Sequence, residues 1–296
     1  MKGMYVAIVL AGLLLGGMAE AAPGASSALN GAEDVYAGVF PPPGLYLINY
    51  QLYYGARTFK DADGHSVPGS DATLAANAVR VVYSSTIEFA GGNLGWHAIV
   101  PLMYKNATIP PTVDGSLSGL GDMYLSPIII GWHFDNNFHL TAGLDVILPT
   151  GKYSRNRTVN LGSNQFTFEP VVAVSKIFDN GLVLDAKLMY DIHTRNNATS
   201  TRTGDQFHMD YAATVPVSES TPLRAGISGY YFKSVRPDRN RNGSIHNSRE
   251  QTFAIGPLLR LDASERTSVT FKAQFESNTE NRFEGNTFWL KIVHAF

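Results

Sequence analysis

The chain contains no cysteine and, for a protein of 296 residues, few charged side chains. Without cysteine it can form neither a disulfide framework nor a thiolate metal site, and it has no thiol nucleophile. Charged residues make up 16% of the chain and the formal net charge is -2, so the basic surface that a nucleic-acid partner requires is missing. We therefore expect no nucleic acid among its partners.

Long apolar runs are also missing, with one exception at the N-terminus. Lys2 precedes an apolar run from Met4 to Met18, and small residues follow up to Ala22. A basic start, a short apolar core and a small-x-small site predict a secretory signal peptide over residues 1–21, cleaved near Ala21 or Ala22. The run is shorter than the about 20 residues that a spanning helix needs. We expect an exported protein that crosses a membrane, if it meets one, with strands.

Residues 22–43 form a small, polar N-terminal leader segment that ends in three consecutive prolines. This segment has no strand or helix periodicity. It could be a periplasmic stub or could fold into a barrel lumen, and the pattern leaves both placements open.

From residue 44 to residue 296 the chain alternates strand-like runs with polar connections. Runs of about ten or more residues suit a tilted membrane strand. Twelve of them are expected, an even number as in bacterial single-chain barrels. They cover residues 44–58, 77–90, 95–109, 119–134, 138–153, 165–178, 182–195, 205–218, 223–236, 250–263, 266–279 and 286–296. The predicted fold class is all-β: an antiparallel, up-and-down transmembrane β-barrel.

The connections between these runs alternate in length. Longer polar loops at 59–76, 110–118, 154–164, 196–204, 237–249 and 280–285 take turns with tight turns such as 135–137 and 179–181. Short turns at one rim and longer loops at the other are typical of outer-membrane barrels, with both termini on the periplasmic side. A soluble sandwich has no reason to keep this alternation.

The last strand, residues 286–296, shows the alternation most clearly. Its apolar positions share one parity, and the chain stops on an aromatic residue. This ending resembles the signal by which outer-membrane barrels are recognised and inserted, so we expect the barrel-assembly machinery as a partner. The strand must also pair with the first one, because an open edge cannot lie in lipid. The residues expected to serve insertion and closure are Phe288, Leu290, Ile292 and Phe296.

Charged residues on the polar faces of the strands are expected to line the lumen. Either they form a charged passage that selects solutes, or they pair across strands and fill the barrel as a polar core. The lumen-lining candidates are Asp122, Asp145, Glu169, Lys187, Asp191, Asp210, Arg260, Lys272 and Glu276.

A second candidate site is the basic cluster of loop 237–249. Its arginines could bind lipopolysaccharide phosphates or an anionic solute, or could be a solvated run of charge. The cluster consists of Arg236, Arg239, Arg241 and Arg249.

Catalysis and metal binding have weak support in the sequence. His208 and Asp210 share a strand face and Ser228 lies on a nearby strand, but the chain has no G-x-S-x-G. The histidines lack H-x-x-x-H spacing, and the acidic run 61–64 is too short for an EF-hand loop. We expect no catalytic residues, no enzyme, no cofactor and no metal.

Several phrases of the chain together resemble a known family. They include Tyr50-Gln51-Leu52-Tyr53-Tyr54, the stretch GDMYLSP at 121–127, PTGKY at 149–153, NLGSN at 160–164 and FEP at 168–170. In this order they are similar to the outer-membrane family named for the meta-pathway of phenol degradation, over nearly the whole mature chain. The resemblance implies an outer-membrane barrel for uptake of substrates of aromatic catabolism.

The expected function is passive uptake of small hydrophobic or aromatic molecules, through the lumen or a side opening in the wall. The alternatives are a closed-lumen structural or surface-binding barrel and, less favoured, a barrel lipid hydrolase. The expected surroundings are outer-membrane lipid and lipopolysaccharide.

Overall fold

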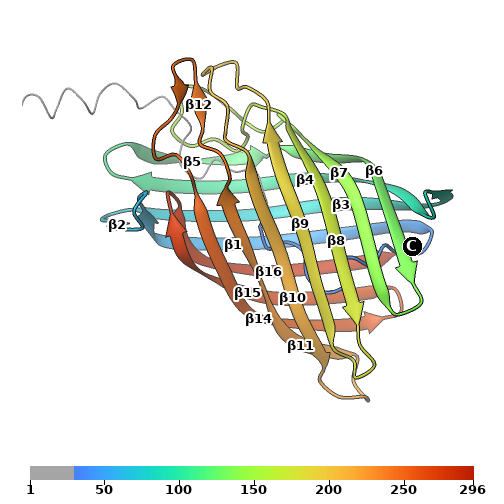
Figure 1. Cartoon of the computed structure of the whole chain (residues 1–296). Helices are drawn as coiled ribbons and strands as arrows, with labels where there is room; N and C mark the ends of the chain where they lie inside the picture. The colour runs from blue at the N-terminus through green and yellow to red at the C-terminus, as the bar shows by residue number, and fades with distance from the viewer. Residues whose placement is uncertain (1–29) are drawn as a thin grey trace, which may run out of the picture.

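The computed structural model describes residues 30–296, so the predicted signal peptide and residues 22–29 of the leader lie outside the described residues. Within the described chain, twelve antiparallel strands close into one barrel, which confirms the predicted fold class (Figure 1). These strands are β1 (Gly44–Lys60), β3 (Asp71–Phe89), β4 (Gly92–Ile109), β6 (Met123–Phe134), β7 (Phe138–Leu148), β8 (Thr167–Ile177), β9 (Val183–His193), β10 (Gln206–Pro216), β11 (Leu223–Ser234), β14 (Gln251–Ser264), β15 (Thr267–Glu280) and β16 (Phe283–Ala295). None of residues 30–296 belongs to a helix long and apolar enough to cross a bilayer.

The barrel is closed by the last strand. β16 pairs antiparallel with β1, with Leu290 opposite Gln51 and Lys291 opposite Tyr50. Residues 286–296 are therefore hydrogen-bonded on both sides, by β15 and by β1, as a strand in lipid requires.

Side chains alternate between the two faces of the wall as the sequence predicts. On β15, Thr270, Lys272 and Gln274 are buried, whereas Phe271 and Phe275 are exposed on the outside. The outer face of β15 is apolar and its inner face carries the polar residues, because a charged side chain facing lipid is destabilising.

Short strands extend the loop end of the barrel, the rim where the longer connections lie. They are β2 (Ser66–Val67), β5 (Val113–Leu120), β12 (Arg239–Asn240) and β13 (Gly243–Ser244). β5 pairs only with β4 among the described strands and continues into β6 after a break at residues 121–122.

Several predicted loops were wrong in extent. The 154–164 loop spans 149–166, because β7 ends at Leu148 and β8 begins at Thr167. The 59–76 loop is short because β1 runs to Lys60 and β3 begins at Asp71; the alanine-rich start of β3 has low strand propensity but pairs fully with β1. Residues 113–118 of the 110–118 loop are strand β5, paired with β4. The 280–285 loop is a two-residue turn at 281–282, so the expected alternation of connection length stops before the last hairpin.

The described part of the leader, residues 30–43, lies inside the barrel except at its end, where Pro42 and Pro43 are exposed. Its backbone is hydrogen-bonded to inward-facing side chains of β8, β9 and β10. Of the two placements that the sequence left open, the lumen is the one observed. We call residues 30–43 the lumen segment.

Candidate functional site

The lumen segment is attached to the barrel wall by its own backbone. Asp210 accepts hydrogen bonds from the amides of Gly31 (2.7 Å) and Glu33 (2.9 Å). Further along, the amide of Gly38 donates to Ser175 Oγ at 2.8 Å, and Thr141 Oγ1 donates to the Gly38 carbonyl at 3.0 Å. These contacts satisfy backbone groups of an irregular segment that is shielded from water.

Two acidic residues of the lumen segment form ion pairs with lysines and an arginine of the wall. Asp34 contacts Lys272 Nζ at 2.8 Å and also pairs with Lys291, and its side chain is fully buried. Glu33 Oε1 accepts a hydrogen bond from Arg80 at 2.6 Å. Burial by itself raises the pKa of both carboxyls, but the attraction of the neighbouring cations outweighs it, so both pKa values lie below their ordinary range.

Phe40 anchors the lumen segment near the turn end, the rim opposite the loop end. Its ring packs with Val82 and Ile129 in a buried cluster. The space it occupies exists because Gly95 and Gly131 carry no side chain: a Cβ on Gly131 would lie 2.1 Å from Phe40 Cβ. Glycine at these two positions thus makes room for the segment.

Six of the nine predicted lumen residues have hydrogen-bond or ion-pair partners in the interior. Asp145 pairs with His97 Nε2 at 3.1 Å, and Glu169 with His208 Nε2 at 3.1 Å. Glu276 accepts from Tyr54 (2.8 Å) and Tyr230 (2.5 Å), whereas Asp191 lies 3.6 Å from His208 Nε2. The remaining two of these six, Asp210 and Lys272, hold the lumen segment.

The other three candidates lie in different surroundings. Asp122 is not on a strand but at the break between β5 and β6, where its carboxylate accepts from the amides of Gly151 (2.9 Å) and Ser163 (2.7 Å). It therefore holds loop 149–166. Arg260 pairs with Asp262 at 2.8 Å, and Lys187 borders a small lumen cavity.

The inner wall of β1, β3 and β4 is largely apolar, in contrast to the polar wall of β8–β10, although Arg80 on β3 and His97 and Lys105 on β4 lie among its side chains. We call the apolar side chains of this inner wall the apolar stripe. Near mid-height it joins a buried cluster that contains Tyr50 and Trp289, and towards the loop end it meets Val159 of loop 149–166. Its members are Leu52, Ala56, Ala72, Ala76, Ala78, Ile99 and Ala107.

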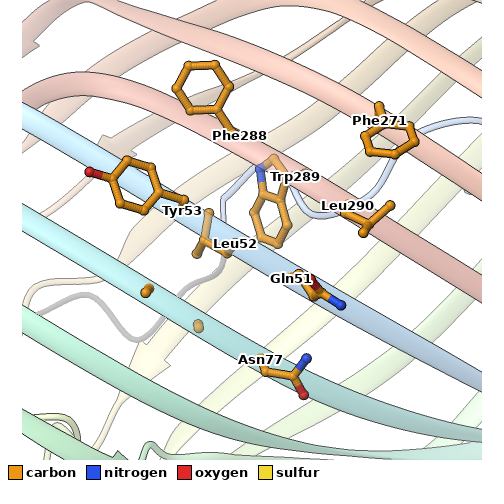
Figure 2. Close-up of a pocket in the computed structure, with 10 residues that line it drawn as sticks. Gln51, Leu52, Tyr53, Asn77, Phe271, Phe288, Trp289 and Leu290 are labelled. Carbon is orange, nitrogen blue, oxygen red and sulfur yellow. The ribbon is translucent and has the colours of Figure 1, made fainter.

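A groove of about 560 Å³ lies against the seam where the barrel closes (Figure 2). Its lining comes from four neighbouring strands, β1, β3, β15 and β16, and it includes Phe288 and Leu290 from the predicted closure residues. Two amides on the outer face, Gln51 and Asn77, line this groove, and both hydrogen-bond to the neighbouring Asn49, at 3.4 Å and 3.2 Å. The outer wall is therefore more polar at the seam than on β15, where phenylalanines face outward.

The remaining predicted residues lie at the two rims. The basic cluster is exposed on the loop between β11 and β14, and Arg236 also pairs with Asp205 at 3.2 Å. Ile292 is half-buried on β16, and Phe296 is exposed while its amide donates to the Leu45 carbonyl at 3.0 Å.

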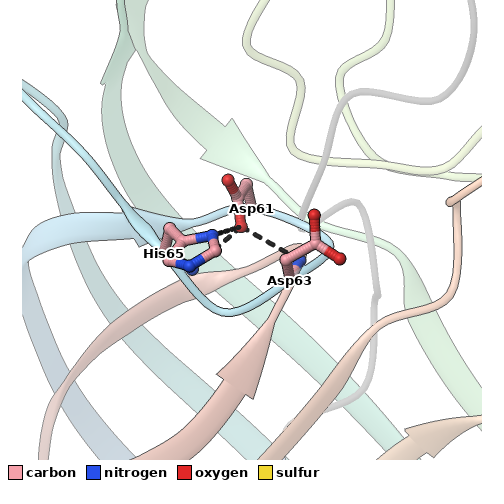
Figure 3. A group of neighbouring side chains, drawn as sticks. All are labelled: Asp61, Asp63 and His65. Carbon is pink, nitrogen blue, oxygen red and sulfur yellow. Dashed lines mark hydrogen bonds and ion pairs between the residues drawn. The ribbon is translucent and has the colours of Figure 1, made fainter.

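Asp61, Asp63 and His65 gather in the first outer loop (Figure 3). The Asp61 carboxylate accepts from the amides of Asp63 (3.0 Å) and His65 (2.8 Å). This is ordinary turn chemistry of an aspartate, so the geometry gives no support for a metal there.

Sequence reasoning missed several groups that matter in the lumen: Glu33, Asp34, Arg80, His97 and Lys291. One signal could have found the first two. Adjacent acids in a leader that precedes strands with inward lysines are candidates for pairing inside the barrel.

Comparison with known proteins agrees with this architecture. Residues 56–292 match the family model described as Putative MetA-pathway of phenol degradation, and the chain belongs to this family. No curated protein matches the chain.

Solved structures share the fold at low sequence identity. An outer membrane channel from Pseudomonas putida F1 is similar with a TM-score of 0.76 and 16% identity, over 88% of this chain and 98% of the other. The β domain of the Bordetella autotransporter BrkA follows with a TM-score of 0.51 and 8% identity, over 86% and 99%. The chain is thus a transmembrane β-barrel of the outer-membrane type.

Proposed function

We propose that this barrel passes small hydrophobic or aromatic molecules across the bacterial outer membrane by passive diffusion. The apolar stripe carries the proposal, because a polar solute would gain nothing from a wall of leucine, isoleucine and alanine side chains. Two findings support it: the family description names a pathway of phenol degradation, and the similar protein from P. putida is described as an outer membrane channel.

The lumen segment shapes the route. It occupies the lumen between ion-paired residues and the Phe40 cluster near the turn end, so a straight aqueous pore would require this segment to move. An apolar solute that follows the stripe from the loop end has two exits: past a displaced segment, or sideways through the wall. The amide-bordered groove at the β1–β16 seam is where a sideways exit would emerge.

One adjacent pair of alanines separates the two surfaces. Both alanines border the outer groove, and only Ala76 also belongs to the apolar stripe. Side chains of a strand alternate between its faces, so the two residues point to opposite sides of the wall. Phenylalanine at residue 76 should obstruct the lumen, and phenylalanine at residue 75 should fill the groove, with the same added volume and no change in charge.

The test is uptake of a radiolabelled monoaromatic compound by cells with an intact lipopolysaccharide layer. We expect the barrel to speed uptake and Ala76→Phe to reduce it. Ala75→Phe should reduce it only if solutes leave sideways. Equal rates of uptake by cells with and without the folded barrel would contradict the proposal.

A closed structural barrel is the second candidate, and the fully buried Asp34–Lys272 pair favours it. In that case neither alanine substitution changes uptake, and the purified barrel carries no solute.

The other sites retain the roles that the sequence suggests, as part of this proposal. Residues 1–21 direct export and are removed near Ala21 or Ala22. The exposed arginines 236, 239, 241 and 249 bind lipopolysaccharide phosphates. Phe288, Leu290, Ile292 and Phe296 present the apolar face that the barrel-assembly machinery recognises.

A further inference from the structure

Three inward side chains from adjacent strands meet at one point of the polar wall. Glu169 lies on β8, Asp191 on β9 and His208 on β10, and one ligand atom of each lies within 4.8 Å of the others. His208 Nε2 is 3.1 Å from Glu169 Oε2 and 3.6 Å from Asp191 Oδ1. All three are at least 98% buried. We call them the carboxylate–histidine triad.

Asp191 is the least satisfied member of the triad, because its neighbour His208 lies beyond hydrogen-bond distance. It has no exposed surface, and neither of its carboxylate oxygens has a hydrogen-bond partner among residues 30–296. A buried carboxylate without hydrogen bonds is costly, and a second carboxylate beside it adds repulsion. Lys187 lines the same region, yet no hydrogen bond or ion pair joins it to Asp191 or Glu169. A further cation would remove this imbalance.

The spacing of the three ligand atoms suits a metal ion. Bonds of about 2.0–2.2 Å to imidazole nitrogen and carboxylate oxygen place neighbouring ligand atoms roughly 3–3.5 Å apart. Of the two distances from His208 Nε2, 3.1 Å lies within this range and 3.6 Å just above it. A cavity of about 40 Å³, bordered by Glu169 and His208, adjoins the triad. At roughly 10–15 Å³ for each water molecule, it has room for water as additional ligands.

We propose that the triad binds one divalent transition-metal ion, such as Zn²⁺, inside the barrel. Imidazole nitrogen with two carboxylates favours Zn²⁺, Co²⁺ or Ni²⁺ over Mg²⁺ and Ca²⁺, which prefer all-oxygen sites. The ion would tie β8, β9 and β10 together and fix the His208 ring on the polar wall. The proposal does not depend on which solute, if any, crosses the barrel.

The test uses the mature barrel, refolded in detergent without a histidine tag and treated with a chelator. Calorimetric titration with Zn²⁺ should show one ion per barrel, and Co²⁺ should give the visible absorption bands of a protein-bound ion. Asp191→Asn, which keeps the shape of the side chain, and His208→Gln should each weaken Zn²⁺ binding at least about ten-fold.

Two controls isolate the site. His97→Gln alters another buried lumen histidine, paired with Asp145, and should leave binding unchanged. Asp61→Asn removes a carboxylate of the exposed turn in Figure 3 and should also leave it unchanged. Folding of each variant is checked by heat-modifiable migration in gel electrophoresis.

The proposal is overturned if the folded wild-type barrel binds neither ion, which would mean that protons, on the carboxylates or on His208, balance the charge instead. It is also overturned if Asp61→Asn abolishes binding while Asp191→Asn does not. If a triad variant fails to fold, magnetic resonance of Co²⁺ in the wild-type barrel decides, since it detects a coordinated imidazole nitrogen.

Discussion

Removing the charge of Asp34 should release the lumen segment from the barrel. The carboxylate contacts Lys272 and Lys291, and the side chains of Asp34 and Lys272 have no exposed surface. Asp34→Asn keeps the shape but leaves two buried lysines without their anionic partner. Breaking a buried ion pair costs about 3–5 kcal/mol, and solvent cannot screen it here. The docking equilibrium should therefore shift by roughly a hundred- to a few-thousand-fold.

The absence of cysteine makes this shift measurable. A single Ala32→Cys substitution places a thiol in the lumen segment, beside the small cavity. A membrane-impermeant maleimide should label this thiol slowly in the otherwise wild-type barrel and much faster together with Asp34→Asn. Single-channel recording should show a matching rise in conductance.

Two further variants test the reasoning. Asp179→Asn, at an exposed turn, is the matched control and should change neither labelling nor conductance. Gly131→Ala should release the segment without any change in charge, because the added Cβ would lie 2.1 Å from Phe40 Cβ. Slow labelling in both Asp34→Asn and Gly131→Ala would refute the claim that these contacts hold the segment in place.

Three other predictions follow from single contacts. Because the pKa of Asp34 is lowered in the folded barrel, its contribution to docking is complete above about pH 4 and is lost as the pH falls through the folded-state value. Single-channel conductance should therefore stay at its neutral-pH level down to about pH 4 and rise below it. Asp122→Ala removes the acceptor for the Gly151 and Ser163 amides, and each buried amide left without a partner costs about 1–3 kcal/mol. Trypsin should therefore cleave loop 149–166 at least about ten-fold faster in this variant. Cleavage of loop 235–250 should not change. Phe296→Ala should lower the yield of folded barrel in cells but not refolding in detergent, since the side chain is 68% exposed; equal losses in both settings would assign Phe296 to stability instead.

Much of the wall could be predicted because the signal is local. A strand exposed to lipid on one face repeats every two residues, so the order Thr270, Phe271, Lys272 reveals which side chain faces inward without any knowledge of neighbours. The strand ends were predicted less well. Residues 71–76 are mostly alanine and polar residues, and only pairing with β1 and β4 makes them a strand.

The contents of the lumen could not be predicted in the same way. Asp34 is 238 residues from Lys272 and 257 from Lys291, and nothing in the local pattern of the leader shows that it turns into the barrel. The carboxylate–histidine triad likewise has no motif, because its members come from three strands and not from one turn of a helix. Which inward residues touch depends on the register of each pairing, and register is a property of the closed barrel.

The sequence by itself thus determined the twelve strands and their inner and outer faces, since both follow from the alternation of polar and apolar residues. It also determined the pairing of the last strand with the first, because the unpaired backbone of an open edge cannot be satisfied in lipid. Only the tertiary structure decided that residues 30–43 occupy the lumen, that Asp122 holds an outer loop, and that Asp191 meets His208. Closure of the barrel brings these distant charges together where their side chains are buried, and there each charge needs a partner.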